Sequence, residues 1–202
     1  MACYSIDGMT PVVHPEAFVH PTASLIGDVI IGPGCYIGPG ASLRGDFGRI
    51  IIERDSNIQD TCVLHSAPGS EMVVEQEGHI GHGAVLHGCR IHKKVLVGIN
   101  AVVMDDAVIG ESSMIAACTF VKTGFECKPR SLIIGIPGKV VRVLTDEETA
   151  WKTEMTSHYM TLARRCLDTL KDVKPLTEAE PDRKRFTTEG KLPRFRDVGN
   201  GK

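Results

Sequence analysis

The stretch IIGPGCYIGPGASL, residues 30–43, places an aliphatic residue at every sixth position. These positions are Ile31, Ile37 and Leu43, and a glycine directly follows the first two. With short slips and one insertion, the same period runs outward through Val13, Val19, Leu25, Ile52, Ile58, Leu64, Ile80, Leu86, Ile91, Val97, Val103, Ile109, Ile115 and Val121. A six-residue period matches neither an amphipathic helix nor an alternating strand. We therefore predict a coiled parallel β structure, in which each hexapeptide is a short strand with an inward aliphatic residue, and glycine permits the bends.

Composition narrows the classes of function. A formal net charge of −2 over 202 residues gives no electrostatic reason to expect nucleic acid or an anionic membrane as partner. The amino-terminal MACYSIDGMTPVV lacks the basic and apolar regions of a signal peptide, and no stretch approaches the roughly 18 apolar residues of a membrane span. Seven cysteines without a CxxC pair favour a reducing compartment over a disulfide framework. We expect a soluble, cytoplasmic protein whose cysteines are mostly small buried residues.

The repeat resembles that of the hexapeptide-repeat proteins over roughly residues 11–140. The resemblance implies a left-handed parallel β-helix, a triangular prism with three hexapeptides and hence about 18 residues in each coil. Members of this family assemble as trimers, so the resemblance also implies a homotrimer.

The pattern changes near residue 145. Apolar residues then recur at helical spacing, at Trp151, Met155, Tyr159, Leu162, Cys166 and Leu170. Thr145 and Glu148 form a predicted capping box, and Pro175 marks a stop. We predict a left-handed β-helix domain over 1–144, an amphipathic helix over 145–171, and a polar tail over 172–202 that is partly disordered or wraps a neighbouring subunit.

Two histidines occupy equivalent positions of the repeat. His65 follows Leu64 as His87 follows Leu86, so both point outward, and the 22 residues between them equal one coil plus an insertion supplied by loop 66–78. Strands of neighbouring coils stack about 4.8 Å apart, so these two side chains can share a metal ion. His82 lies five residues before His87, an extended distance of roughly 16 Å, and cannot reach the same ion within its own chain. In a threefold assembly, His82 of one subunit could instead face His65 and His87 of the next.

Several motifs resemble the γ-class carbonic anhydrases and their relatives: LRGD at 43–46, NIQD at 57–60, VLH at 63–65 and HGAVLHG at 82–88. The resemblance implies a divalent metal, with zinc preferred and iron or cobalt open, held at each subunit interface by His65, His82 and His87. Such a centre has open positions for water and produces a metal-bound hydroxide nucleophile. The alternative is that these are ordinary surface histidines.

The same motifs imply roles for neighbouring residues. Arg44 and Asp46 match an intersubunit ion pair that Asp60 would join, with placement of an anionic substrate by Arg44 as the alternative. Gln59 matches a glutamine that hydrogen bonds to metal-bound water or an oxyanion, and its alternative is a solvated surface amide. Tyr159, in HYMTLARR, matches a tyrosine that approaches the metal, although its helical spacing is equally typical of packing. The other five histidines have only surface or local hydrogen-bonding roles: His14, His20, His79, His92 and His158.

A metal hydroxide attacks electrophilic carbon, so CO2 hydration and thioester hydrolysis are both open. Where the carbonic anhydrases place a glutamate, this chain has Phe47, which cannot relay protons. The following loop offers three substitutes for that glutamate, namely Glu71, Glu75 and Glu77.

The segments RGDFGRI, GHIGH, LHGC and EPDRKR resemble the PaaY and CaiE subgroup, named for phenylacetate degradation and a carnitine operon. This resemblance implies an acyl-CoA thioesterase acting on CoA thioesters of phenylacetate degradation, in which metal-bound hydroxide attacks the thioester carbonyl. Arg183, Lys184 and Arg185 would then meet CoA phosphates, or remain a solvated charge run. A γ-class carbonic anhydrase, a hexapeptide acyltransferase and a noncatalytic scaffold are the alternatives. An acyltransferase relies on one histidine base and does not need converging metal ligands.

Overall fold

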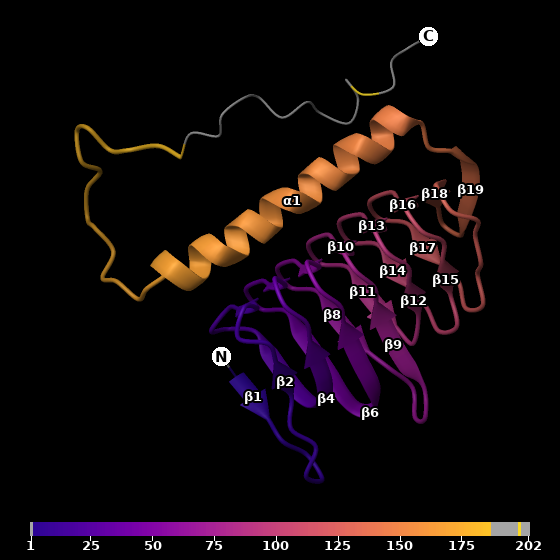
Figure 1. The fold of residues 1–202 in the computed structure, drawn as a ribbon, viewed down its shortest axis with the longest axis horizontal. Helices are drawn as coiled ribbons and strands as arrows, with labels where there is room; N and C mark the ends of the chain where they lie inside the picture. The colour runs from indigo at the N-terminus through magenta and orange to yellow at the C-terminus, as the bar shows by residue number, and fades with distance from the viewer. Residues whose placement is uncertain (1, 187–197, 199–202) are drawn as a thin grey trace.

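The computed structural model describes residues 2–186 and 198 as a left-handed β-solenoid followed by one helix, which confirms the predicted fold class (Figure 1). An eight-stranded stack comprises β3 (Phe18–Val19), β5 (Tyr36–Ile37), β7 (Asn57–Ile58), β10 (His79–Ile80), β13 (Leu96–Val97), β16 (Met114–Ile115), β18 (Ser131–Gly135) and β19 (Gly138–Val143).

A second, eleven-stranded sheet covers the other faces of the prism. Its strands are β1 (Ala2–Tyr4), β2 (Val12–Val13), β4 (Ser24–Ile31), β6 (Ser42–Ile52), β8 (Val63–His65), β9 (Glu71–Val74), β11 (Val85–His87), β12 (Arg90–Ile91), β14 (Val102–Val103), β15 (Val108–Ile109) and β17 (Phe120–Val121). The ladders between strands are parallel except for the final β18–β19 hairpin. The 66–78 insertion is partly ordered as β9, which pairs with β6 and β12 and so continues the solenoid wall.

The six-residue period marks the core. Of the predicted inward aliphatic residues, all are buried except Val13, which is partly buried and packs against the same cluster. One contiguous core therefore runs along the prism axis, built from thin layers of Ile, Val and Leu.

The glycines within residues 30–43 have two separate structural roles. Gly34 and Gly40 lie at corners with φ of +70° and +68°, which a glycine adopts without strain. Gly38 has no positive φ, but a Cβ there would lie 2.9 Å from the backbone nitrogen of Asp60 in the next coil. The glycine directly after the aliphatic residue, as at Gly38, is thus needed because neighbouring coils approach closely there. The glycine two residues later, as at Gly40, provides the bend.

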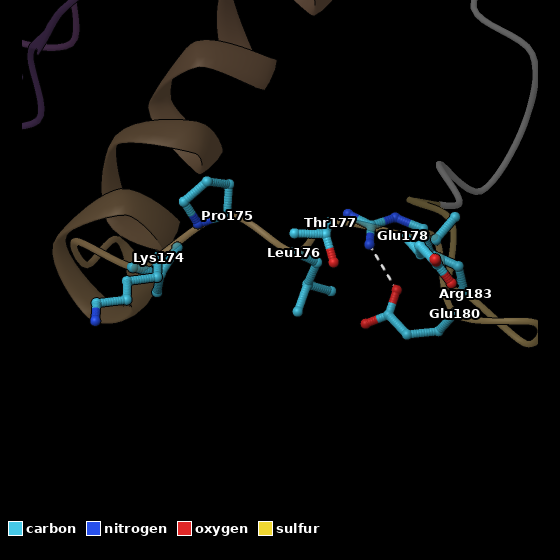
Figure 2. Close-up of a pocket in the computed structure, with 9 residues that line it drawn as sticks. Lys174, Pro175, Leu176, Thr177, Glu178, Glu180 and Arg183 are labelled. Carbon is cyan, nitrogen blue, oxygen red and sulfur yellow. Dashed lines mark hydrogen bonds and ion pairs between the residues drawn. The ribbon is translucent and has the colours of Figure 1, made fainter.

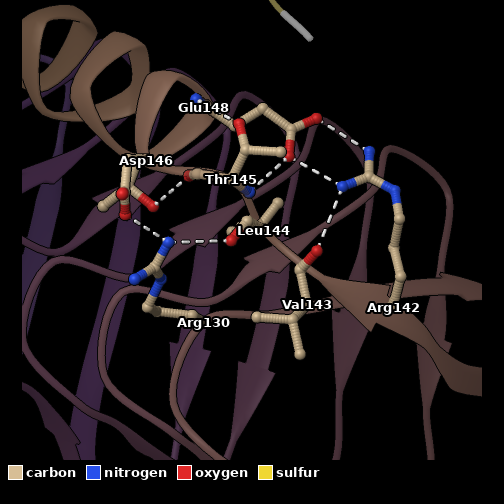
Figure 3. Close-up of polar contacts among 8 residues, drawn as sticks. Arg130, Arg142, Val143, Leu144, Thr145, Asp146 and Glu148 are labelled. Carbon is tan, nitrogen blue, oxygen red and sulfur yellow. Dashed lines mark hydrogen bonds and ion pairs between the residues drawn. The ribbon is translucent and has the colours of Figure 1, made fainter. Parts of the chain in front are cut away.

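The helix α1 (Asp146–Thr169) runs back along the eight-stranded stack and contacts β3, β5 and β7 (Figure 1). Both halves of the predicted capping box are present between Thr145 and Glu148. Figure 3 shows Arg142 donating two hydrogen bonds to the Glu148 carboxylate, each 2.7 Å, and Arg130 reaching Asp146. These contacts fix the start of α1 where the chain leaves the solenoid, and therefore set the direction of the whole helix.

Residues 173–183, beyond α1, lie away from the solenoid (Figure 1). They form a hollow lined by residues of the same segment, where Arg183 donates to Glu180 at 2.6 Å (Figure 2). The remaining tail prediction, for residues 187–197 and 199–202, lies outside the described residues. No helix within residues 2–186 and 198 is long and apolar enough to cross a membrane.

Candidate functional site

His65 and His87 lie side by side on β8 and β11, as the repeat predicted. They are direct partners in the parallel ladder, and the Nδ1 of His65 is 3.1 Å from the Nε2 of His87. The far nitrogen of each ring faces a carboxylate: Asp46 Oδ1 lies 2.9 Å from His65 Nε2, and Asp105 Oδ1 lies 2.6 Å from His87 Nδ1.

These carboxylates determine which nitrogen of His65 and of His87 carries the proton. An ionised carboxylate only accepts hydrogen bonds, so each imidazole places its N–H on the nitrogen that faces an aspartate. In neutral rings, the two facing nitrogens of His65 and His87 then both carry lone pairs. Two lone pairs 3.1 Å apart repel unless a cation or an extra proton lies between them. Ligands on a tetrahedral zinc ion are about 3.4 Å apart, given Zn–N bonds of about 2.0–2.1 Å, so the separation suits a shared metal.

His82 repeats this arrangement on a different face. It follows β10 in the eight-stranded stack, and its Nδ1 is 2.5 Å from Asp60 Oδ2. Its Nε2 points away from that carboxylate and faces the Tyr159 hydroxyl at 3.4 Å. A histidine with one nitrogen on a carboxylate and the other free is the common arrangement of a metal ligand.

Within one chain the three histidines do not converge. His65 and His87 belong to the eleven-stranded sheet and His82 to the eight-stranded stack. Over residues 2–186 and 198, no group of three or more His, Cys, Asp or Glu side chains is arranged to hold a metal ion. One chain therefore presents the His65–His87 pair and His82 on separate faces.

The acidic residues Asp46 and Asp60 lie on different faces, Asp46 beside His65 and Asp60 beside His82. Arg44 pairs with Asp46 at 2.6 Å within the chain, next to His65. Burial alone would raise the pKa of Asp46, but hydrogen bonds from Arg44 and His65 outweigh it and lower that pKa, so the carboxylate stays ionised. Asp60 was expected to join Arg44 and Asp46, but in this chain it contacts His82, because it follows β7 in the other stack.

Known proteins of one family are similar in sequence to this chain. The profile described as bacterial transferase hexapeptide (six repeats) matches residues 10–45 and 88–123. The carnitine operon protein CaiE of Salmonella agona (strain SL483) is 53% identical over 186 residues, 92% of this chain and 94% of that protein. CaiE of Escherichia coli (strain K12) is 51% identical over 92% of this chain and 95% of its own length. The chain belongs to the hexapeptide-repeat family.

Solved structures agree with this membership. A hexapeptide transferase family protein from Anaplasma phagocytophilum superposes with a TM-score of 0.78 at 35% identity, covering 81% of this chain and 96% of that one. The BC4754 gene product of Bacillus cereus, described as an acetyltransferase candidate, superposes with a TM-score of 0.80 at 31% identity, covering 81% and 95%.

Gln59 in this hexapeptide-repeat protein is buried, not a solvated surface amide. Its Nε2 donates to Asn57 Oδ1 at 2.9 Å and approaches His79 Nε2 at 2.8 Å, and its Oε1 accepts the His82 backbone N–H at 3.2 Å. Both amide hydrogens are thus engaged inside the chain. A direct contact of Gln59 with substrate stays a prediction and would require one of these bonds to be replaced.

His79 is a residue whose environment the repeat did not predict. We expected a surface or a local hydrogen-bonding role for it, and the second holds. The helix α1 covers His79: its Nδ1 lies 3.3 Å from Thr156 Oγ1, and the Tyr159 ring packs edge-on against it. Burial lowers its pKa to about 4, with smaller contributions from Lys152 and His82, so it is a neutral acceptor for Gln59. Its position directly before inward Ile80 was the only sequence signal available.

Tyr159 combines packing with a site contact. Its ring centroid is 5.4 Å from that of Tyr36, while its hydroxyl faces His82. Burial raises the pKa of Tyr159 to about 12, with the Asp60 charge adding to it, so the phenol keeps its proton at neutral pH. Tyr159 can therefore donate a hydrogen bond beside His82.

Proposed function

We propose that this protein is a metal-dependent acyl-CoA thioesterase that works as a homotrimer. Each site would take His65 and His87 from one subunit and His82 from the next. The observation that carries the proposal is the shared orientation of the three rings, each holding one nitrogen on an aspartate and leaving the other free. A carboxylate partner alone does not mark a ligand, since His92 Nδ1 also lies 3.0 Å from Glu75. The stacking of His65 on His87, with nitrogens 3.1 Å apart, distinguishes this pair from His92.

A divalent cation held by these nitrogens would supply Lewis-acid polarisation of the thioester carbonyl and activation of a water molecule. The chain's own groups prepare the site for this chemistry. Asp46, Asp105 and Asp60 orient the imidazoles, and the protonated Tyr159 hydroxyl is available as a donor to a developing oxyanion near His82. The substrates proposed are CoA thioesters of phenylacetate degradation, in the cytoplasm.

A hexapeptide acyltransferase is the second candidate. It is favoured by the transferase description of the family profile and by the Bacillus cereus neighbour. Both candidates act on an acyl-CoA, but only the hydrolase requires the three converging histidines.

One set of parallel assays separates these functions. The purified protein, stripped of metal and reloaded with zinc, iron or cobalt, is given phenylacetyl-CoA, and free thiol is measured beside CO2 hydration and acyl transfer to amines. We expect metal-dependent thiol release that is lost in His65→Ala and retained in His14→Ala, which changes an exposed histidine of the first coil. Thiol release that survives chelation or His65→Ala would overturn the metal-dependent mechanism. Fast CO2 hydration without thiol release would instead identify a carbonic anhydrase, and metal-independent acyl transfer an acyltransferase.

A further inference from the structure

An open groove lies between α1 and the eight-stranded stack, next to His82. Its volume is about 490 Å³, within the range of about 300–1,000 Å³ typical of small-molecule sites. Two of its lining side chains, Ile99 and Ile134, are 49% and 44% exposed, so apolar surface faces solvent there.

The groove changes character along its length. At one end, its wall contains the polar groups of Gln59, His82 and Tyr159. At the other end Met114 and Leu132 pack with Trp151, and all three line the groove. The walls extend from β10 through β13 and β16 to β18, three strand spacings, or roughly 14 Å.

We propose that this groove binds the acyl group of the CoA thioester, and that it selects uncharged apolar acyl groups; this inference rests on the proposed function. Burial of an apolar chain removes its own surface and that of Ile99 and Ile134 from water, which favours binding. The polar end places the carbonyl end of such a chain beside His82.

The lining also argues against a cationic acyl group. Among the described residues, no Asp, Glu, Lys or Arg lines the groove, so a trimethylammonium group, such as a carnitine-type acyl chain carries, would lose its hydration without an ion pair. An aromatic cage can replace a carboxylate. Here, however, the Tyr159 ring already packs against Tyr36 and His79, and Trp151 packs against Met114 and Leu132 at the other end of the groove, so the two rings do not form a cage.

The single tryptophan of the chain gives a direct readout, because Trp151 lines the groove. Non-hydrolysable alkyl-CoA thioethers of increasing length, and one ending in trimethylammonium, are titrated into the trimer while Trp151 fluorescence is recorded. We expect the emission to shift on binding and the affinity to rise by up to about fourfold per methylene, which corresponds to about 0.8 kcal/mol per buried CH₂. The trimethylammonium thioether should bind no better than the shortest alkyl one.

A matched pair of variants tests the location. Ala117→Phe adds a ring at an exposed position of the groove wall, and Ala150→Phe adds the same ring on α1 at an exposed position outside it. We expect Ala117→Phe to weaken the longer thioethers at least tenfold and Ala150→Phe to leave them unchanged. Affinity that is independent of chain length, or equal effects of the two variants, would overturn the inference.

Two further outcomes keep the inference apart from the proposed function. If chain-length-dependent binding occurs without any thiol release, the groove is an acyl site and the thioesterase proposal fails. If thiol release occurs with no preference for chain length and no Trp151 response, the thioesterase stands and the groove inference fails. A change in trimer mass caused by Ala117→Phe, with thioether affinity unaltered, would identify the groove as a contact between subunits and also overturn it.

Discussion

At the scale of single residues, the sequence located the histidines but not the groups that orient them. The register that pairs His65 with His87 follows from the period, and the ladder confirms it. Asp105 was missed, although its spacing of 18 residues from His87 is one coil. That spacing was the available signal, since residues one coil apart stack on each other.

Asp105→Asn should weaken metal binding while leaving the fold intact. An amide cannot fix the His87 tautomer as a carboxylate does, and loss of such a partner typically costs about 10–100-fold in metal affinity. The control is Asp106→Asn, which makes the same change at the exposed neighbouring position. Metal retained against a competing chelator is the measurement, and equal retention in both variants would contradict the assigned role.

The buried His79 predicts an acid-sensitive stability. Because burial lowers its folded-state pKa from 6.5 to about 4, the unfolded chain binds the proton more readily between these values. Its stabilisation is therefore complete above pH 6.5 and is lost as the pH falls toward 4, a change on the order of 3 kcal/mol. Urea unfolding of the wild type and of His79→Gln across this range measures it, and the variant should show a flatter dependence. Ile80→Val, a destabilised control, should keep the wild-type slope; a slope unchanged in His79→Gln would refute this account.

At the scale of elements, the start of α1 was predicted well and its covering role was not. The capping box and helical spacing are local features, so the sequence displays them directly. Which outward residues α1 buries depends on the direction it takes along the stack. That direction is fixed by contacts of Arg142 with Glu148 and of Arg130 with Asp146, which join the end of the solenoid to the first turn of α1 and which helical spacing does not reveal.

Thr145→Ala should detach the first turn of α1. Loss of an N-cap typically costs about 1 kcal/mol of stability. Thr161→Ala, at an exposed position inside the same helix, should leave the stability unchanged or raise it by a few tenths of a kcal/mol, because alanine has the higher helix propensity. Unfolding monitored by far-UV circular dichroism compares the two variants. Equal losses would show that the cap does not anchor the helix.

At the scale of the whole molecule, the proposed trimeric site, which takes its histidines from two faces, predicts complementation between inactive variants. His82→Ala and His65→Ala would each be inactive alone, but mixed trimers contain interfaces at which the His65–His87 pair and His82 are both intact. An equal mixture after subunit exchange should recover about a quarter of the wild-type thioesterase activity. At each interface, the His65–His87 pair comes from a chain with intact His65 in about half of cases, and His82 comes from a chain with intact His82 in about half of cases. The measurement is thiol release before and after exchange. No recovery, with exchange verified by mass, would place the site within one chain.

The sequence by itself determined the solenoid, its core and the register of the histidines. A β-helix is nearly one-dimensional, because each coil contacts mainly its neighbours, and a short period therefore specifies both inward residues and stacked outward ones. Only the tertiary structure decided what covers the outward residues. The burial of His79 and Gln59 and the groove beside Trp151 arise where α1 returns along the eight-stranded stack. Contacts between segments this far apart leave no period in the sequence.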